Sequence, residues 1–327
     1  GGGANHVTNY SMAGRNSTVV VALQRSGPSE VEVWSSNDGG ATFSLVLIDG
    51  QGALPSVNEN NHDDYFAHPL PQLHFVDDTH VVMLSQVTPG GIRNVMVSHG
   101  VLDGSGALTS MSTSNGGNDI GLSSTHDVRV KIASRGSTVV VGGIHGTGSS
   151  GGSGETGNLR VAVSHDWGAT FSAPIEAVTA TQGSALFRTH VEWILLMTTN
   201  PSGGDRIVAL ANDPTNGDPI AMFSSDDDGQ SWTDLAPIAN TGAGPIGDIV
   251  LGYAVADDRV AFLSTNLNFG SQPTGLHPHV RLYVVEDLDL AALEQLVEPL
   301  DERLGQRVDP GVRRDLVDQP AAVTHPP

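Results

Sequence analysis

The stretch of this sequence with the most varied chemistry is residues 58–68, which read NENNHDDYFAH. It combines amide, carboxylate, imidazole and phenol groups, which proteins use to bind sugar hydroxyls or Ca²⁺. Tyr65 offers a ring face for stacking on a sugar, while neighbouring Asn and Asp side chains can hydrogen-bond to hydroxyls directly or through a cation. The predicted ligand-binding residues are Asn61, His62, Asp63, Asp64, Tyr65, His68 and His126. The structural alternative is a solvated loop whose Asn and Asp side chains cap turns.

Three further polar motifs carry weaker functional signals. His277 and His279 lie on one side of an extended segment, as a metal pair requires, but no carboxylate or third histidine lies nearby in the sequence. Residues 226–228 are three aspartates without the later ligand spacing of a calcium loop. The glycine-rich residues 146–157 lack the Lys-Ser/Thr of a phosphate-binding loop. We therefore expect no metal site and no cofactor, with Ca²⁺ at residues 58–68 as the open alternative.

Charge and composition exclude several classes of function. The chain has 327 residues and a net charge of -21, which opposes binding to nucleic acid or to anionic lipid. The absence of cysteine excludes disulfides, thiolate metal sites and a cysteine nucleophile. No apolar run reaches the roughly 18 residues of a membrane span. Because the sequence starts at Gly1 rather than Met, we expect a leader to have been removed and the protein to be extracellular or periplasmic.

A turn motif occurs three times, at residues 36–43 (SNDGGATF), 164–171 (SHDWGATF) and 225–232 (SDDDGQSW). The shared pattern is Ser-x-Asp-x-Gly-x-Thr/Ser-aromatic. In a tight turn between strands, the Asp carboxylate accepts hydrogen bonds from backbone N–H groups, and Gly adopts a positive φ. The aromatic ring then packs the turn against the next sheet. The predicted structural residues are Ser36, Asp38, Gly40, Phe43, Ser164, Asp166, Gly168, Phe171, Ser225, Asp227, Gly229 and Trp232.

This motif resembles the Asp-box, and the chain is similar to the Asp-box (BNR-repeat) β-propellers of the sialidase-like superfamily. The resemblance implies that each box lies on the hairpin between the third and fourth strands of a blade, away from the ligand-binding face. Sialidases hold the substrate carboxylate with three arginines and use a Tyr nucleophile paired with Glu, plus an Asp acid/base. Here the Arg-Ile-Pro motif is missing, the first arginines are Arg15 and Arg25, and Tyr253 and Tyr283 lie inside strand patterns. The resemblance therefore identifies no catalytic residue.

Self-similar β-rich runs start at residues 17, 79, 137, 205 and 258, and each is followed by a second run that ends near an Asp-box position. The second unit keeps only a degenerate box at residues 97–100, and the fifth only one at 285–287. Period-2 alternation and β-branched residues predict the strands. These predicted strands are 17–24, 31–36, 79–86, 94–98, 127–132, 137–143, 160–164, 206–211, 219–224, 249–255, 259–264 and 280–285.

These observations predict an all-β fold, a single β-propeller over residues 1–287, with five blades or alternatively six. Leucines at helical spacing predict an amphipathic helix over residues 288–304 that packs on the propeller. Residues 305–327, which are charged and contain proline, are expected to form a loosely held tail. In such a propeller, the loops near residues 49–71 and 112–126 reach the face opposite the Asp-boxes.

The absence of a recognisable arginine triad favours a non-catalytic, secreted or surface propeller that binds a carbohydrate or protein ligand through its loop face. Two alternatives stay open. One is a diverged sialidase-like glycoside hydrolase or lyase, and the other is a structural scaffold of a surface assembly.

Overall fold

The computed structural model describes residues 7–25, 30–55, 71–87, 94–122, 130–146, 157–178, 193–211, 220–238, 248–256, 259–266 and 280–285, and the statements below concern these residues. They form an all-β fold with a single short 3₁₀ turn, η3 (Ser114–Gly116). The predicted helix at 288–304 and the predicted tail at 305–327 lie outside the described residues.

The strands are β1 (Val7–Arg15), β2 (Thr18–Arg25), β3 (Glu30–Ser36), β4 (Ser44–Ile48), β5 (Leu54–Pro55), β6 (Gln72–Phe75), β7 (His80–Val87), β8 (Asn94–Val101), β9 (Ser110–Thr113), β10 (Lys131–Arg135), β11 (Thr138–Gly146), β12 (Gly157–Ser164), β13 (Ile175–Val178), β14 (Trp193–Thr199), β15 (Asp205–Ala211), β16 (Ile220–Ser225), β17 (Thr233–Ile238), β18 (Asp248–Ala256), β19 (Arg259–Asn266) and β20 (Val280–Val285).

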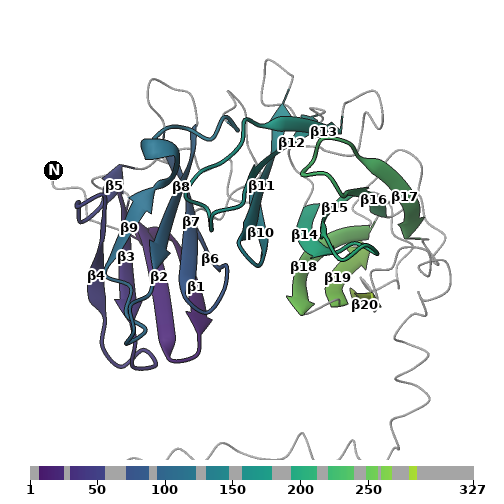
Figure 1. Ribbon diagram of the computed structural model, residues 1–327. Coiled ribbons are helices and arrows are strands. Elements are labelled where there is room, and N and C mark those ends of the chain that lie inside the picture. The colour runs from purple at the N-terminus through teal and green to yellow at the C-terminus, as the bar shows by residue number, and fades with distance from the viewer. Residues whose placement is uncertain are drawn as a thin grey trace, which may run out of the picture.

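Within the described residues, the strands form successive antiparallel groups: β1–β4, β6–β9, β10–β13, β14–β17 and β18–β20. A short parallel pairing of β4 with β9 joins the first two groups into one sheet, and β5 pairs with the beginning of β3. The first strands of successive groups contact one another: β1 with β6, β10 with β14, and β14 with β18. Figure 1 shows the groups following one another around an arc. The first strand of each group is therefore its inner strand.

The core lies between neighbouring groups, because the second strands of the three middle groups, β7, β11 and β15, bury both of their faces. In β7, Val81 and Met83 pack against the first group. Val82 and Leu84 pack against the third group instead. Alternate side chains of one strand thus enter two different hydrophobic clusters, which explains why this strand is a continuous apolar run.

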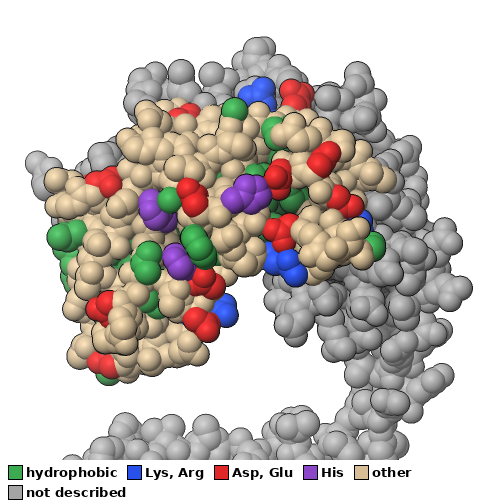
Figure 2. Space-filling model, in the orientation of Figure 1, with side chains coloured by type: hydrophobic (Ala, Val, Ile, Leu, Met, Phe, Trp, Pro, Cys, Tyr) green, Lys and Arg blue, Asp and Glu red, His purple; other side chains and the backbone are tan. Residues whose placement is uncertain are grey.

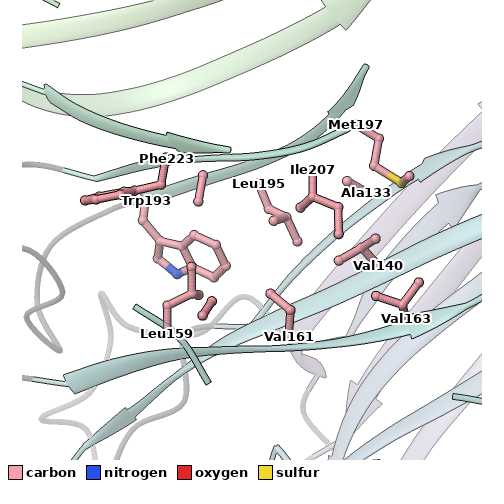
Figure 3. Close-up of a cluster of buried hydrophobic side chains, with 12 residues drawn as sticks. Ala133, Val140, Leu159, Val161, Val163, Trp193, Leu195, Met197, Ile207 and Phe223 are labelled. Carbon is pink, nitrogen blue, oxygen red and sulfur yellow. The ribbon is translucent and has the colours of Figure 1, made fainter. Parts of the chain in front are cut away.

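The cluster between the third and fourth groups contains the largest side chains. Trp193 and Leu195 from β14 meet Leu159 and Val161 from β12, as Figure 3 shows. Trp193 is 1% exposed. Burial of such large apolar side chains is the main favourable contribution to holding the groups together.

Two predictions at the level of single elements were wrong. The strand expected at residues 127–132 overlaps β10, Lys131–Arg135, but Val130 lies before the strand, and residues 127–129 are outside the described residues. The tight hairpin to β11, in which Arg135 pairs with Thr138 and Gly136 has a positive φ of 57°, sets this later position.

The degenerate box predicted at residues 97–100 is not a turn, because β8 continues to Val101. The turn follows it, and Asp103 accepts hydrogen bonds from Ser105 N at 2.8 Å, Ser105 Oγ at 2.6 Å and Ala107 N at 3.0 Å. The second group therefore forms an aspartate-centred turn without the sequence motif. The degenerate box expected at 285–287 lies at the edge of the described residues, and its turn is outside them.

Candidate functional site

The three repeated motifs form the same hydrogen-bonded turn, called here an Asp turn (residues 36–43, 164–171 and 225–232). In the second, Asp166 accepts hydrogen bonds from Ser164 Oγ at 2.7 Å, Thr170 N at 2.8 Å and Thr170 Oγ1 at 2.7 Å. Ser164 Oγ in turn accepts from the N–H of Gly168 at 2.9 Å. Asp38 and Asp227 make the corresponding bonds in the other two turns. These carboxylates thus act as turn-forming acceptors.

Hydrogen bonding keeps these carboxylates ionised. The hydroxyl of Ser36, followed by the backbone and side chain of Thr42, lowers the pKa of Asp38 below its usual value. Burial of Asp166 alone would raise the pKa of that carboxyl, but the hydrogen bonds from Thr170 and Ser164 outweigh burial and lower it. A carboxylate held ionised by several donors is a poor general acid at neutral pH. The Asp turns are therefore unsuited to acid catalysis.

The same end of the strands also carries contacts between neighbouring groups. Arg15 pairs with Asp78, which links the first group to the second. Arg135 pairs with Asp205 at 2.7 Å, which links the third group to the fourth. In the view of Figure 2, acidic and histidine side chains lie close together across the surface of the described residues.

Between the second and third groups the contact is aromatic. His80 stacks on Trp167 with ring centroids 4.6 Å apart and planes inclined by 16°. Trp167 Nε1 donates to Asp77 Oδ2 at 2.9 Å. Because this end of the strands joins groups to one another, we assign it a structural role.

The opposite strand ends flank the predicted ligand-binding residues. β5 pairs with the beginning of β3, with Glu30 opposite Pro55, at the end of β3 remote from its Asp turn. β6 begins at Gln72, which pairs with Leu84 far from the β6–β7 hairpin. The chain therefore leaves the first group and enters the second at this opposite end. The predicted residues themselves, Asn61, His62, Asp63, Asp64, Tyr65, His68 and His126, lie outside the described residues, as do His277 and His279.

A polar pair that the sequence analysis missed lies between the inner strands β6 and β10. His74 Nε2 lies 2.6 Å from Ser134 Oγ, and Gln72 Nε2 donates to the carbonyl of Val130 at 3.1 Å. Burial, with a smaller contribution from the charge of Arg15, lowers the pKa of His74 to about 4. The imidazole is therefore neutral at pH 7.

A histidine within hydrogen-bonding distance of a serine hydroxyl is the minimum arrangement for nucleophilic activation, but such a base also needs a group that orients it. Among the described residues, the hydrogen-bonding partner of His74 is the hydroxyl of Ser134 and not a carboxylate. Nothing in the local sequence QLHF signals the pair, because the two residues are 60 positions apart. We interpret it as a polar link between inner strands.

The described part of the chain contains no cluster of three or more His, Cys, Asp or Glu side chains that could bind a metal ion. In the same part, no helix has the length and apolar character needed to cross a membrane.

No protein-family model and no curated protein matches this chain. Solved structures similar to it include the Hadza microbial sialidase Hz136, with 13% identity and a TM-score of 0.43 over 79% of this chain and 50% of that one. The chain thus spans half the length of that sialidase. An α-L-arabinanase of Penicillium chrysogenum has 10% identity and a TM-score of 0.37, covering 88% of this chain and 94% of its own. An ulvan lyase of polysaccharide lyase family PL25 has 12% identity and a TM-score of 0.48, covering 86% and 71%.

Proposed function

We propose that the chain is an Asp-box β-propeller of five blades, with six as the alternative, that binds a carbohydrate or protein ligand without hydrolysing it. The ligand-binding surface comprises Asn61, His62, Asp63, Asp64, Tyr65, His68 and His126. The observation that supports this proposal most directly is that the two ends of the strands carry different polar groups. The carboxylates of the Asp turns are occupied by turn donors, whereas the polar segment 58–68 is attached at the opposite end, between Pro55 and Gln72.

The chemistry of the segment suits sugar recognition. A tyrosine ring covers the apolar face of a sugar, and amide and carboxylate groups pair with its hydroxyls in fixed directions. Asp63 and Asp64 are adjacent acidic residues that could also coordinate Ca²⁺ through oxygen ligands. The net charge of -21 opposes binding to phosphate-rich partners. A secreted or surface location is part of this proposal.

The alternative is a diverged glycoside hydrolase or lyase. The observation that bears on it is His74 beside Ser134 on the inner strands, the minimum arrangement for activating a hydroxyl, but a pKa of about 4 makes this imidazole a weak base. Catalysis would need further groups from the loop end, such as a pair of carboxylates about 5 to 10 Å apart for a glycosidase.

The test combines a glycan array with a panel of fluorogenic glycosides and of uronic-acid polysaccharides assayed for elimination. It compares the parent chain with a variant carrying Tyr65→Ala and Asp64→Ala. The matched control carries Gln230→Ala and Thr233→Ala, two exposed positions at the Asp-turn end. We expect the parent and the control to bind the same glycan, the first variant to lose at least tenfold in affinity, as removal of a stacked aromatic anchor does, and no protein to turn over any substrate.

Turnover by the parent would refute the non-catalytic proposal and favour the hydrolase or lyase. Unchanged affinity in the Tyr65→Ala, Asp64→Ala variant would refute the assignment of the site. Equal loss of affinity in the control would point to the Asp-turn end instead.

A further inference from the structure

The first group has one apolar face that no described residue covers. Strand pairing places Met12, Val21, Trp34 and Leu45 in one row across β1, β2, β3 and β4, so their side chains point to the same side of the sheet. Met12 is 68% exposed and Leu45 is 40% exposed. Tyr10 and Leu47, which are 70% and 44% exposed, extend the same face. We call the face formed by Tyr10, Met12, Val21, Trp34, Leu45 and Leu47 the open face.

The corresponding strands of other groups show that this exposure is unusual within the molecule. In β7, residues 81–85 are buried without interruption, and so are residues 138–143 of β11 and 206–210 of β15. β2 instead alternates between buried and partly exposed residues. Yet residues 19–23 of β2, which read VVVAL, are apolar on both faces, as in a strand that is covered on both sides. The composition of β2 therefore indicates a covering element.

We propose that residues 288–304 of this chain cover the open face as an amphipathic helix. Leu293, Leu296, Leu300 and Leu304 recur at helical spacing, and acidic residues such as Glu294 and Glu298 lie beside them. The segment follows β20, which belongs to the group at the far end of the arc from β1–β4 (Figure 1). Pro299 kinks or ends the helix, and the eleven residues before it, 288–298, span about 16 Å as a helix, long enough to cross several strands spaced about 5 Å apart.

The first test is disulfide trapping, which is unambiguous because the chain contains no cysteine. Met12→Cys is combined, one at a time, with Leu293→Cys, Leu296→Cys and Leu300→Cys, and each double variant is oxidised at low protein concentration. A disulfide requires Cα atoms within about 7 Å of each other. We expect a monomeric cross-link in at least one of these variants, and none in the matched control Met12→Cys with Gln295→Cys, which places the thiol off the leucine stripe.

Other occupants give different products. A covalent dimer formed by Met12→Cys alone would assign the open face to a second copy of the chain and overturn the proposal. A cross-link only between Met12→Cys and Phe262→Cys would assign it to the β18–β20 sheet, and would also overturn it.

The second test needs no cross-link. The reaction of a Met12→Cys thiol with a water-soluble disulfide reagent is timed in the full chain, with and without Leu296→Asp and Leu300→Asp. We expect the two aspartates to speed the reaction about tenfold, because a covered thiol reacts only after local opening. A Thr42→Cys thiol in an exposed Asp turn should react at the same rate in both backgrounds. Equal rates for the Met12→Cys thiol in the two backgrounds would overturn the proposal.

Discussion

Replacement of Asp166 by alanine tests whether the Asp turn depends on its carboxylate. The substitution removes the acceptor of three hydrogen bonds, from Ser164 Oγ, Thr170 N and Thr170 Oγ1. A hydrogen bond to a charged acceptor contributes about 1.5 to 3 kcal/mol when its donor is buried. Thr170 is exposed, so water replaces part of this loss. We therefore expect Asp166→Ala to lower the free energy of unfolding by about 1 to 2 kcal/mol.

The pH dependence gives an independent check. Since the folded-state pKa of Asp166 lies below its unfolded value, the carboxylate stabilises the fold above pH 4 and this contribution disappears as the pH falls through the folded-state pKa. The free energies of unfolding of the parent and of Asp166→Ala should therefore differ at pH 7 and converge as the solution is acidified below pH 4.

The assay is urea denaturation followed by circular dichroism at pH 7 and at pH 3. Asp166→Asn is the matched control, because it keeps one acceptor oxygen and removes the charge. Its free energy of unfolding should lie between those of the parent and of Asp166→Ala. Equal stability of parent and Asp166→Ala at pH 7 would refute the reasoning, and so would an undiminished difference at pH 3. Ligand binding at the opposite strand end should be unchanged.

Two further predictions concern single positions. Gly168→Ala should lower the free energy of unfolding by about 1 to 3 kcal/mol, because Gly168 has a φ of +88° and the new Cβ would lie 2.7 Å from Val82 Cγ1. Adding Val82→Ala to this variant should restore only part of the lost melting temperature. Full restoration would show that the backbone is not strained. In the parent, we expect the free energy of unfolding to decrease as the pH falls from about 6.5 to about 4, because in this range His74 is protonated in the unfolded state but not in the folded state. His74→Gln should remove this decrease. An identical pH profile of unfolding in parent and variant would contradict the prediction.

Much of the strand pattern was predictable from local alternation. The second and third strands of the groups, such as β2, β3 and β7, match the predicted ranges within a few residues. The inner strands β1 and β6, the outer strands β4, β9, β13 and β17, and the short β5 were missed. β1 (VTNYSMAGR) and β6 (QLHF) carry polar residues that form contacts between groups, so neither shows a clear apolar period. β14 was missed although its sequence WILLMTT is continuously apolar, because such a run has no alternation to detect.

The sequence by itself determined the Asp turns, because all of their characteristic bonds join residues within four positions of each other and need no distant partner. It also determined the all-β class through the composition of the strands. Only the tertiary structure located the turn centred on Asp103, the pairing of His74 with Ser134, and the open face of β1–β4. Each of these depends on which strands lie beside which. Apolar residues on both faces of a strand show that it can be covered on both sides, but the arrangement of the groups decides which face has a neighbour.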